Sequence, residues 1–372
     1  MPRELIAVAP RTPELRAYAE PVLGPTDIRI RSELASPKHG TELVAYRDDP
    51  VANRPYDPAW GAVIPSPPDP GRSRYPMRLG NMTVGVVVDT GPDASRFQVG
   101  DRVFGHLPIR ETHSVDEALV DPLPDGLSPE AAVCLDPVVM ALPIRDAGIR
   151  LGDTVAVFGL GAIGLAAVQL ARLAGASTVI AVDPIEKRRT LATAFGADIV
   201  IDPTAHDGDA ALAIRALGGV PEPVPQPRPG IHVTGGYTDR PTQVNQLGVD
   251  VAIETSGSTQ ALHQAIRATR YGGTVCVVSF YGREGTGLLL GEEFHINQIT
   301  MRSVRAESLP MRNAPAWTLQ RVVDLAINWM IEGRIRTGGL LDPVVPFAES
   351  AEAYRDIDEH PERSIKLGIR FD

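Results

Sequence analysis

The sequence contains few cysteines and few lysines. Cys134 and Cys276 are its only cysteines among 372 residues, too few for a disulfide framework or a four-cysteine zinc lobe within one chain. A reducing compartment, the cytoplasm, is therefore expected. Basic residues are almost all arginine, and the three lysines are Lys38, Lys187 and Lys366. Lys38 is conspicuous because this chain does not use lysine as a general surface residue.

An excess of positive charge is also missing. The chain has 36 lysines and arginines against 46 acidic residues, a net charge of −10. Nucleic acids and anionic membranes attract proteins through a basic face, so we expect neither as a partner. The charge says nothing more about the substrate, and the small-molecule substrate expected here rests on the motifs below. The N-terminus has no apolar core and does not resemble a signal peptide. The uncharged run 154–171 has nearly the length of a membrane span, but its three glycines favour a strand followed by a helix.

The pattern of elements changes twice along the chain. Short strands and turns are expected over 26–135, and strands then alternate with helices over 153–304. This alternation predicts a parallel, doubly wound sheet. After 305 the alternation stops, with a helix expected over 315–332 and a last strand over 365–371, so this tail is expected to complete the N-terminal domain. The strands of the alternating part are predicted at 154–158, 178–182, 198–202, 249–254, 274–279 and 299–304.

A glycine-rich turn is the strongest chemical motif. Gly159, Gly161 and Gly164 follow the apolar run 154–158 with the Gly-x-Gly-x-x-Gly spacing of a dinucleotide-binding turn. Gly159 permits a tight turn, Gly161 lets the backbone approach a pyrophosphate, and Gly164 lets the helix pack on the strand. The pyrophosphate is expected on the free N–H groups of the helix N-terminus. The predicted cofactor-binding turn comprises Gly159, Leu160, Gly161, Ala162, Ile163 and Gly164.

Asp183 predicts NAD as the cofactor in preference to NADP. It ends the second strand of the alternating part, and its carboxylate can accept hydrogen bonds from both adenosine ribose hydroxyls and repel a 2′-phosphate. Arg188 is a candidate for covering the adenosine, and a helix-surface arginine in a charge cluster is the equal alternative. Four residues at later strand ends are expected near the nicotinamide: Thr255, Ser256, Val278 and Ser279.

Taken together, these motifs resemble the medium-chain dehydrogenase/reductase superfamily, the fold of zinc alcohol dehydrogenases. The resemblance implies an α/β protein with a Rossmann doubly wound parallel sheet over 136–304 and a mostly β, GroES-like catalytic domain formed by 1–135 and 305–372. It also implies an active site in the cleft between them and a homodimer. Besides the glycine turn, it is carried by Gly100-Asp101-Arg102-Val103, Leu123-Pro124-Asp125-Gly126-Leu127-Ser128, Gly196-Ala197-Asp198, residues 250–257 and Gly272-Gly273.

The zinc-binding positions of that family are altered here. Zinc members carry Cys-Gly-Thr-Asp and later Gly-His-Glu, where this chain has residues 39–42, His-Gly-Thr-Glu, and 80–82, Gly-Asn-Met. Cys134 falls near the third ligand position. Because the amide of Asn81 is a weak zinc ligand, no catalytic zinc is expected. The sequence leaves open whether residual metal binds at His39 and Cys134. Residues 36–42 and 294–298 are similar to a zinc-free branch with bacteriochlorophyllide dehydrogenase and oxidoreductases of secondary metabolism.

Without zinc, side chains must accept a proton and stabilise the alkoxide. Thr41 matches the family hydroxyl that bonds the substrate oxygen and relays its proton, and His39 titrates near neutral pH two residues away. His39 and Thr41 are therefore predicted to form the proton path. Lys38 is a candidate donor to an oxyanion, and Asn81 is a candidate for orienting the substrate. Three of them also have a structural alternative: Thr41 satisfying a turn, His39 filling the old ligand position, and Lys38 lying in solvent.

Four other polar residues are assigned less specific roles. Glu42 is expected to hold its loop by hydrogen bonds, and Cys134 to be a small buried apolar residue. His106 and His113 are candidates for lining the cleft, although their spacing does not require it. Two long segments interrupt the pattern. Residues 51–78 are interpreted as a substrate lid, with a surface insertion as the alternative. Residues 219–246 are interpreted as a proline-rich surface insertion, with an oligomer contact as the alternative.

The predicted function is NAD(H)-dependent, zinc-independent interconversion of a secondary alcohol and a ketone on a polar natural-product, sugar or cyclitol intermediate. One alternative is a C=C reductase of the enoyl or quinone type, which would prefer NADPH and which Asp183 disfavours. A second is a redox-neutral epimerase or eliminase that retains NAD. A third, from another class, is a non-catalytic NAD-binding regulator.

Overall fold

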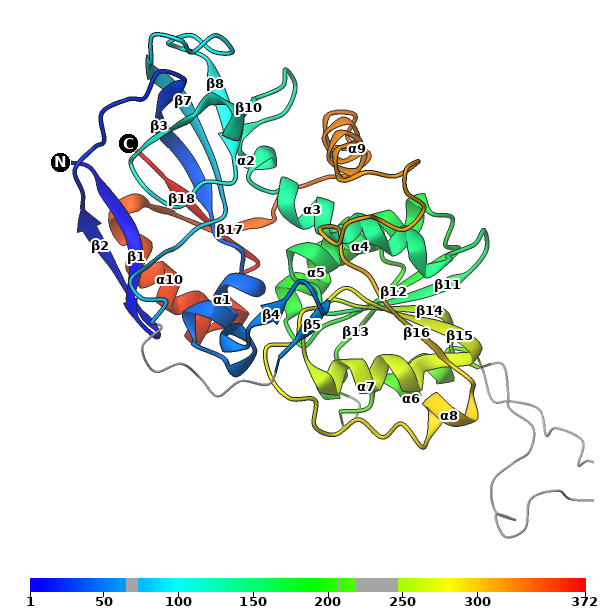
Figure 1. Cartoon of the computed structure of the whole chain (residues 1–372). Coiled ribbons are helices and arrows are strands. Elements are labelled where there is room, and N and C mark those ends of the chain that lie inside the picture. The colour runs from blue at the N-terminus through cyan, green and yellow to red at the C-terminus, as the bar shows by residue number, and fades with distance from the viewer. Residues whose placement is uncertain (65–72, 206–207, 219–246) are drawn as a thin grey trace, which may run out of the picture. The chain divides into compact units, whose positions relative to one another are not determined.

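The chain forms two compact units (Figure 1). A computed structural model describes residues 1–64, 73–205, 208–218 and 247–372. The first unit comprises Met1–Val139, Phe280–Glu284 and Ala316–Asp372, and the second comprises Met140–Ser279 and Gly285–Pro315. The domain boundaries expected from sequence stay a prediction, because the borders of compact units need not coincide with those of domains.

The second unit contains a six-stranded parallel sheet in the order β13-β12-β11-β14-β15-β16. The chain starts at β11, builds outward to β13, and then returns to the other side of β11. This confirms the predicted doubly wound sheet, and the reversal of strand order beside β11 is where such sheets bind ligands. The strands are β11 (Thr154–Phe158), β12 (Thr178–Val182), β13 (Ile199–Ile201), β14 (Val249–Glu254), β15 (Thr269–Val277) and β16 (Thr300–Ser303).

Helices accompany these strands. Because both faces of a parallel sheet are covered, its strands are continuously apolar, and residues 155–158 of β11 are all buried. The uncharged run 154–171 is β11 followed by most of α4. No helix in the described parts of the chain is long and apolar enough to span a membrane. The helices are α4 (Ala162–Leu173), α5 (Glu186–Ala194), α6 (Ala210–Ala216), α7 (Thr259–Ala268) and α8 (Glu293–Ile296).

The first unit is built on a sheet in the order β10-β8-β7-β3-β18-β17, with β9 also paired to β3. The last strand, β18, pairs antiparallel with β3 (Figure 1). The tail therefore completes the N-terminal sheet, as predicted. The strands are β3 (Asp27–Ser36), β7 (Met82–Thr90), β8 (Arg102–Gly105), β9 (Thr112–Asp116), β10 (Asp121–Pro122), β17 (Leu341–Pro346) and β18 (Lys366–Arg370).

A smaller sheet and two helices share an apolar core with this one. Tyr46, Leu79, Tyr354 and Leu367 are fully buried in that core, and the rings of Tyr46 and Tyr354 pack edge to face, 4.9 Å apart. The smaller sheet is β2 (Thr12–Ala17), β1 (Arg3–Ala9) and β6 (Met77–Arg78), and the unit's short helices include α1 (Thr41–Tyr46), α2 (Pro129–Ala132) and α10 (Ser350–Glu359), while α3 (Leu135–Ala141) runs into the second unit.

The helix predicted over 315–332 begins four residues later. It is α9 (Leu319–Ile331). The hydroxyl of Thr318 accepts a hydrogen bond from the Arg321 N–H at 3.2 Å, so Thr318 caps the helix and satisfies one of its free N–H groups. Pro315 therefore lies outside the helix and does not open its first turn.

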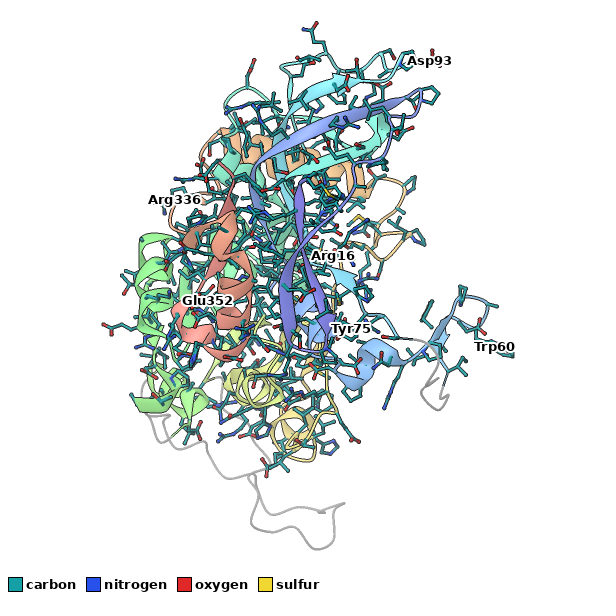
Figure 2. All side chains as sticks on the ribbon, turned by 90° about the vertical axis from the view of Figure 1, so that its left-hand side faces the viewer. Arg16, Trp60, Tyr75, Asp93, Arg336 and Glu352 are labelled. Carbon is teal, nitrogen blue, oxygen red and sulfur yellow. The ribbon has the colours of Figure 1, made fainter. Side chains whose placement is uncertain are left out.

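The two long segments seen in the sequence are only partly described. In the first, β4 (Tyr56–Asp57) and β5 (Ala62–Val63) form a small hairpin. Figure 2 shows Trp60 on this projecting hairpin, and Trp60 is 80% exposed. The proline-rich insertion 219–246 lies outside the described residues.

Candidate functional site

Four strand ends of the first unit meet at one end of its sheet. In the antiparallel pairs, Ser36 of β3 faces Met82 of β7, and Thr83 of β7 faces Gly105 of β8. The loop after β3, the residues before β7 and the loop after β8 therefore lie side by side. Because Ala35 faces Ile369, the first residues of β18 reach the same end. We call this end the loop edge, defined by residues 37–42, Gly80, Asn81, His106, Lys366 and Leu367.

Glu42 holds two of these loops together. Its Oε2 accepts the Lys38 N–H at 3.0 Å, and its Oε1 accepts the Gly80 N–H and the Tyr354 hydroxyl, both at 2.7 Å. Burial raises the pKa of Glu42, and these donors act in the opposite direction. The predicted structural role of Glu42 is thus confirmed by its contacts.

Two lysines lie at the loop edge. The Nζ of Lys38 is 2.9 Å from Oδ1 of Asp136, whose side chain is 4% exposed. Lys38 is therefore held in an ion pair and does not extend freely into solvent. Lys366 is buried, and its Nζ donates to the Pro37 carbonyl at 2.8 Å. Sequence reasoning missed Lys366; its signal was that the chain has so few lysines.

His39 is fixed by the last strand. The Leu367 N–H donates to Nε2 of His39 at 2.9 Å. An N–H can donate only to an unprotonated ring nitrogen, so the neutral imidazole carries its proton on Nδ1. While this bond is intact, His39 can donate from Nδ1 and cannot take up a proton at Nε2.

Thr41 opens helix α1 and is exposed. Gly40 is the N-cap residue and makes no side-chain cap bond. Within the described part of the chain, the Thr41 hydroxyl has no hydrogen-bond partner. It therefore presents a donor and an acceptor to solvent, which suits the substrate contact predicted for it.

Asn81 and His106 face each other across neighbouring loops. The Asn81 N–H donates to the Ser36 carbonyl at 3.1 Å, which places its backbone. Its Oδ1 lies 3.3 Å from Nδ1 of the exposed His106. The amide nitrogen of Asn81 is buried and has no hydrogen-bond partner among the described residues, so the side chain retains an unused donor.

His113 does not belong to the loop edge. It lies in β9 opposite Ile30 and is 1% exposed. Burial lowers its pKa to about 3, and the positive charges of Arg110 and Arg78 act in the same direction. His113 is therefore a neutral core residue, and its candidacy for lining a cleft is corrected here.

The side chains at the family's zinc positions do not fit a catalytic zinc ion. The Nε2 lone pair of His39 already accepts a backbone hydrogen bond. Asn81 offers an amide, a weak ligand for this ion. Cys134 is fully buried, and burial raises the pKa of its thiol to about 11, which disfavours the thiolate that zinc binds.

The three glycines of the turn in the second unit differ in the space around them. Gly159 has a φ of +87°, which favours glycine, and a Cβ on Gly164 would lie 1.8 Å from the Gly159 carbonyl oxygen. Gly161 is the N-cap of α4, and nothing lies within 4 Å of a Cβ built on it. Gly159 and Gly164 thus serve the turn itself, whereas Gly161 leaves open space above the helix N-terminus.

Asp183 is tied to the same turn. Its Oδ2 accepts the Leu160 N–H at 2.7 Å and its Oδ1 accepts the Ile185 N–H at 2.8 Å, and the residue is 3% exposed. Arg188 lies beside it, with Nη1 3.8 Å from Oδ2. Asp183 therefore shapes the turn, and each of its carboxylate oxygens can accept a further bond.

The strand-end residues predicted near a nicotinamide lie at the ends of β14 and β15. The Thr255 hydroxyl donates to the carbonyls of Phe158 and Gly159, at 3.1 and 2.6 Å. Ser256 bonds the carboxylate of Glu254. Three further bonds tie these ends together: Ser279 Oγ accepts the Gly257 N–H at 2.8 Å, and the Val278 N–H and Ser279 Oγ donate to the Glu254 carbonyl at 3.0 and 3.4 Å.

Comparison with known proteins agrees with this architecture. Residues 162–327 match the model of the family described as zinc-binding dehydrogenase, and residues 59–118 match the alcohol dehydrogenase GroES-like domain. D-guloside 3-dehydrogenase of Escherichia coli is 37% identical over 99% of this chain and 100% of its own length.

A sequence relative and a solved structure are both named as butanediol dehydrogenases of Bacillus subtilis. The (R,R)-butanediol dehydrogenase of Bacillus subtilis is 30% identical over 61% of this chain and 63% of its own. The crystal structure of 2R,3R-butanediol dehydrogenase from the same species matches with a TM-score of 0.69 at 23% identity, over 100% of this chain and 99% of its own. By its full-length similarity, both family models and its fold, the chain belongs to the medium-chain dehydrogenase/reductase superfamily.

Proposed function

We propose that this chain is a cytoplasmic, NAD(H)-dependent, zinc-independent oxidoreductase that acts as a homodimer and interconverts a secondary alcohol and a ketone on a polar sugar, cyclitol or natural-product intermediate. The observation that carries the proposal is the full-length similarity to D-guloside 3-dehydrogenase, whose name specifies oxidation of a sugar derivative. It favours the sugar class among these substrates. The homodimer is supported by the edge position of β16 in its sheet, where Met301 is 43% exposed.

The residues of the second unit fit a dinucleotide. The open space over Gly161 suits a pyrophosphate on the free N–H groups of α4. Asp183 would bond the adenosine ribose, and Arg188 would cover the adenosine. Bound NAD⁺ supplies the acceptor for the hydride that leaves the alcohol carbon. A 2′-phosphate would meet the carboxylate of Asp183, so NAD is favoured over NADP.

The loop edge supplies groups that can hold a substrate oxygen. Thr41 offers its hydroxyl, Asn81 its unused amide donor, and Lys38 a positive charge fixed by Asp136. His39 lies two residues before Thr41 and is held against β18 by the Leu367 N–H. Fixed donors and a cation stabilise developing negative charge on oxygen most strongly where water is excluded. This is the work that zinc performs in other members of the superfamily, and here side chains would do it.

Three measurements on one preparation test the proposal. Protein purified without chelators is analysed for zinc, titrated with NADH and NADPH by fluorescence, and assayed with NAD⁺ against methyl glycosides of hexoses, hexitols, cyclitols and 2,3-butanediol. We expect less than stoichiometric zinc, tighter binding of NADH than of NADPH, and reduction of NAD⁺ with a polyol or glycoside.

Each contrary result would change a different part of the proposal. One zinc per chain would mean that His39 and Cys134 are ligands after all. Tighter NADPH binding would contradict the role given to Asp183. Nucleotide binding without turnover of any compound would favour a regulator, and cofactor that stays bound and unchanged during turnover would favour an epimerase or eliminase.

A further inference from the structure

Oxidation of an alcohol requires a group that accepts its hydroxyl proton. Most side chains at the loop edge cannot be the final acceptor of that proton. Lys38 is held as a cation against Asp136, and the lone pair of His39 Nε2 accepts the Leu367 N–H. The hydroxyl of Thr41 can relay a proton but has to pass it on, because an alcohol is a poor base. Glu42 already accepts hydrogen bonds from Lys38, Gly80 and Tyr354, and Lys366 is buried against the Pro37 carbonyl. Among the titratable side chains of the loop edge, His106 is the exposed one.

His106 reaches it from the neighbouring strand. Because Thr83 faces Gly105 in the β7–β8 pair, the residue before β7 and the residue after β8 come out side by side. His106 is exposed at this position, and its Nδ1 lies 3.3 Å from Oδ1 of Asn81. An amide oxygen only accepts, so this contact places the imidazole proton on Nδ1 and leaves the lone pair on Nε2.

The other described histidines of the first unit do not offer such a lone pair at this edge. His39 has its Nε2 occupied. His113 is buried in β9, opposite Ile30 of β3. His360 follows helix α10 and contacts Glu362, with its Nδ1 3.5 Å from that carboxylate. By position and by hydrogen bonding, His106 differs from all three.

We propose that His106 accepts the hydroxyl proton of the substrate through Nε2, and that Asn81 is the positioning residue that sets its tautomer. This proposal rests on the function proposed above. In the oxidation, the C–H bond at the alcohol carbon breaks and its hydride goes to NAD⁺. The O–H bond breaks, its proton forms an N–H bond at Nε2, and the electron pair left on oxygen forms the C=O bond. The imidazolium then returns its proton to water.

The experiment compares three variants with the compound that wild type oxidises fastest among the glycosides and polyols named above. His106→Ala is expected to lower kcat by about 10²- to 10⁴-fold, as for loss of a general base. Added imidazole is expected to restore part of this activity. His106→Gln keeps a hydrogen-bond donor for Asn81 and has no basic nitrogen, so it is expected to be as slow as His106→Ala and to gain nothing from imidazole. His360→Ala is the matched control and is expected to retain wild-type kcat.

Two observations separate catalysis from folding. All variants are expected to unfold at the temperature of the wild type and to bind NADH equally well. Wild-type kcat in His106→Gln would overturn the proposal, because the glutamine would then replace the histidine by its shape and donor alone. Failure of imidazole to raise kcat of a folded His106→Ala would also overturn it. A wild type that oxidises none of the compounds would instead overturn the proposed function, and this proposal with it.

Discussion

The glycines of the cofactor turn have different physical tasks although they belong to one motif. A Cβ on Gly164 would meet the Gly159 carbonyl oxygen at 1.8 Å and the Thr255 hydroxyl at 2.7 Å. Backbone atoms cannot give way as the end of a flexible side chain can. Gly161 has an ordinary φ of −69° and open space where a Cβ would lie. Gly164 is therefore required by the turn itself, whereas the open space at Gly161 supports the proposal that a pyrophosphate approaches there.

Substitution of these two glycines by alanine should separate the two tasks. Gly164→Ala is expected to lower the free energy of unfolding by about 1–3 kcal/mol, as overpacking of a tight contact does. Gly161→Ala is expected to keep the unfolding temperature of the wild type and to weaken NADH binding by about tenfold, or about 1.4 kcal/mol. Thermal unfolding and NADH titration measure both quantities. Equal NADH affinity in Gly161→Ala would show that the pyrophosphate does not approach this position.

Helix α10 and strand β18 position a loop that lies more than three hundred residues earlier in the chain. Tyr354 of α10 donates to Glu42, and Lys366 and Leu367 of β18 bond Pro37 and His39. Glu42 in turn receives the N–H groups of the two loops that carry Lys38 and Asn81. The candidate catalytic side chains are thus held by elements whose own sequence shows no chemical motif.

Removing the Tyr354 hydroxyl tests this support. Tyr354→Phe keeps the ring against Tyr46 and leaves Glu42 with one hydrogen-bond donor fewer. The free energy of unfolding is expected to fall by about 1–3 kcal/mol, as it does when a buried polar group loses a partner. Because small displacements of catalytic groups are costly, kcat is expected to fall roughly 10- to 100-fold with NADH affinity unchanged. Tyr18→Phe, which removes a hydroxyl bonded to the Thr112 carbonyl, is the control and should retain activity. Wild-type kcat in Tyr354→Phe would contradict the support role.

The stability of the first unit as a whole depends on groups that stay uncharged in its core. His113 has its pKa lowered from 6.5 to about 3. Between these values the unfolded chain binds a proton that the folded chain does not. The stability associated with His113 is therefore fully present above pH 6.5 and is lost as the pH falls toward 3.

Replacement of His113 by leucine should remove this dependence. In the wild type, the free energy of unfolding is expected to fall by up to about 1.4 kcal/mol per pH unit below 6.5 from this group. His113→Leu fills a similar volume and takes up no proton, so its curve should be flatter there. Urea unfolding from about pH 7.5 to about pH 4 covers the upper part of the interval between the two pKa values and measures both curves. Parallel curves over the whole range would show that His113 binds its proton equally well in the folded state.

The local sequence was sufficient for the parts of the fold that depend on neighbouring residues. Apolar runs such as 154–158, separated by glycine-ended helices, predicted the parallel sheet, because burial on both faces leaves a direct trace in composition. The glycine turn and the acidic strand end followed from spacing alone. The start of α9 was wrong because a threonine cap, Thr318, outweighed the helical pattern before it.

The candidate site, in contrast, was decided by tertiary structure. Sequence named His39, Thr41 and Asn81 because they lie at family positions, and Lys38 because the chain has so few lysines. Which atoms they offer depends on partners far along the chain. The bond from Leu367 takes the lone pair of His39, the register of β7 and β8 brings His106 to Asn81, and β18 buries Lys366 beside Pro37. The sequence by itself determined the sheet and the cofactor turn, since these rest on short-range pattern and backbone sterics. Only the folded chain decided which nitrogen can accept a proton, because strand pairing and long-range hydrogen bonds set that chemistry.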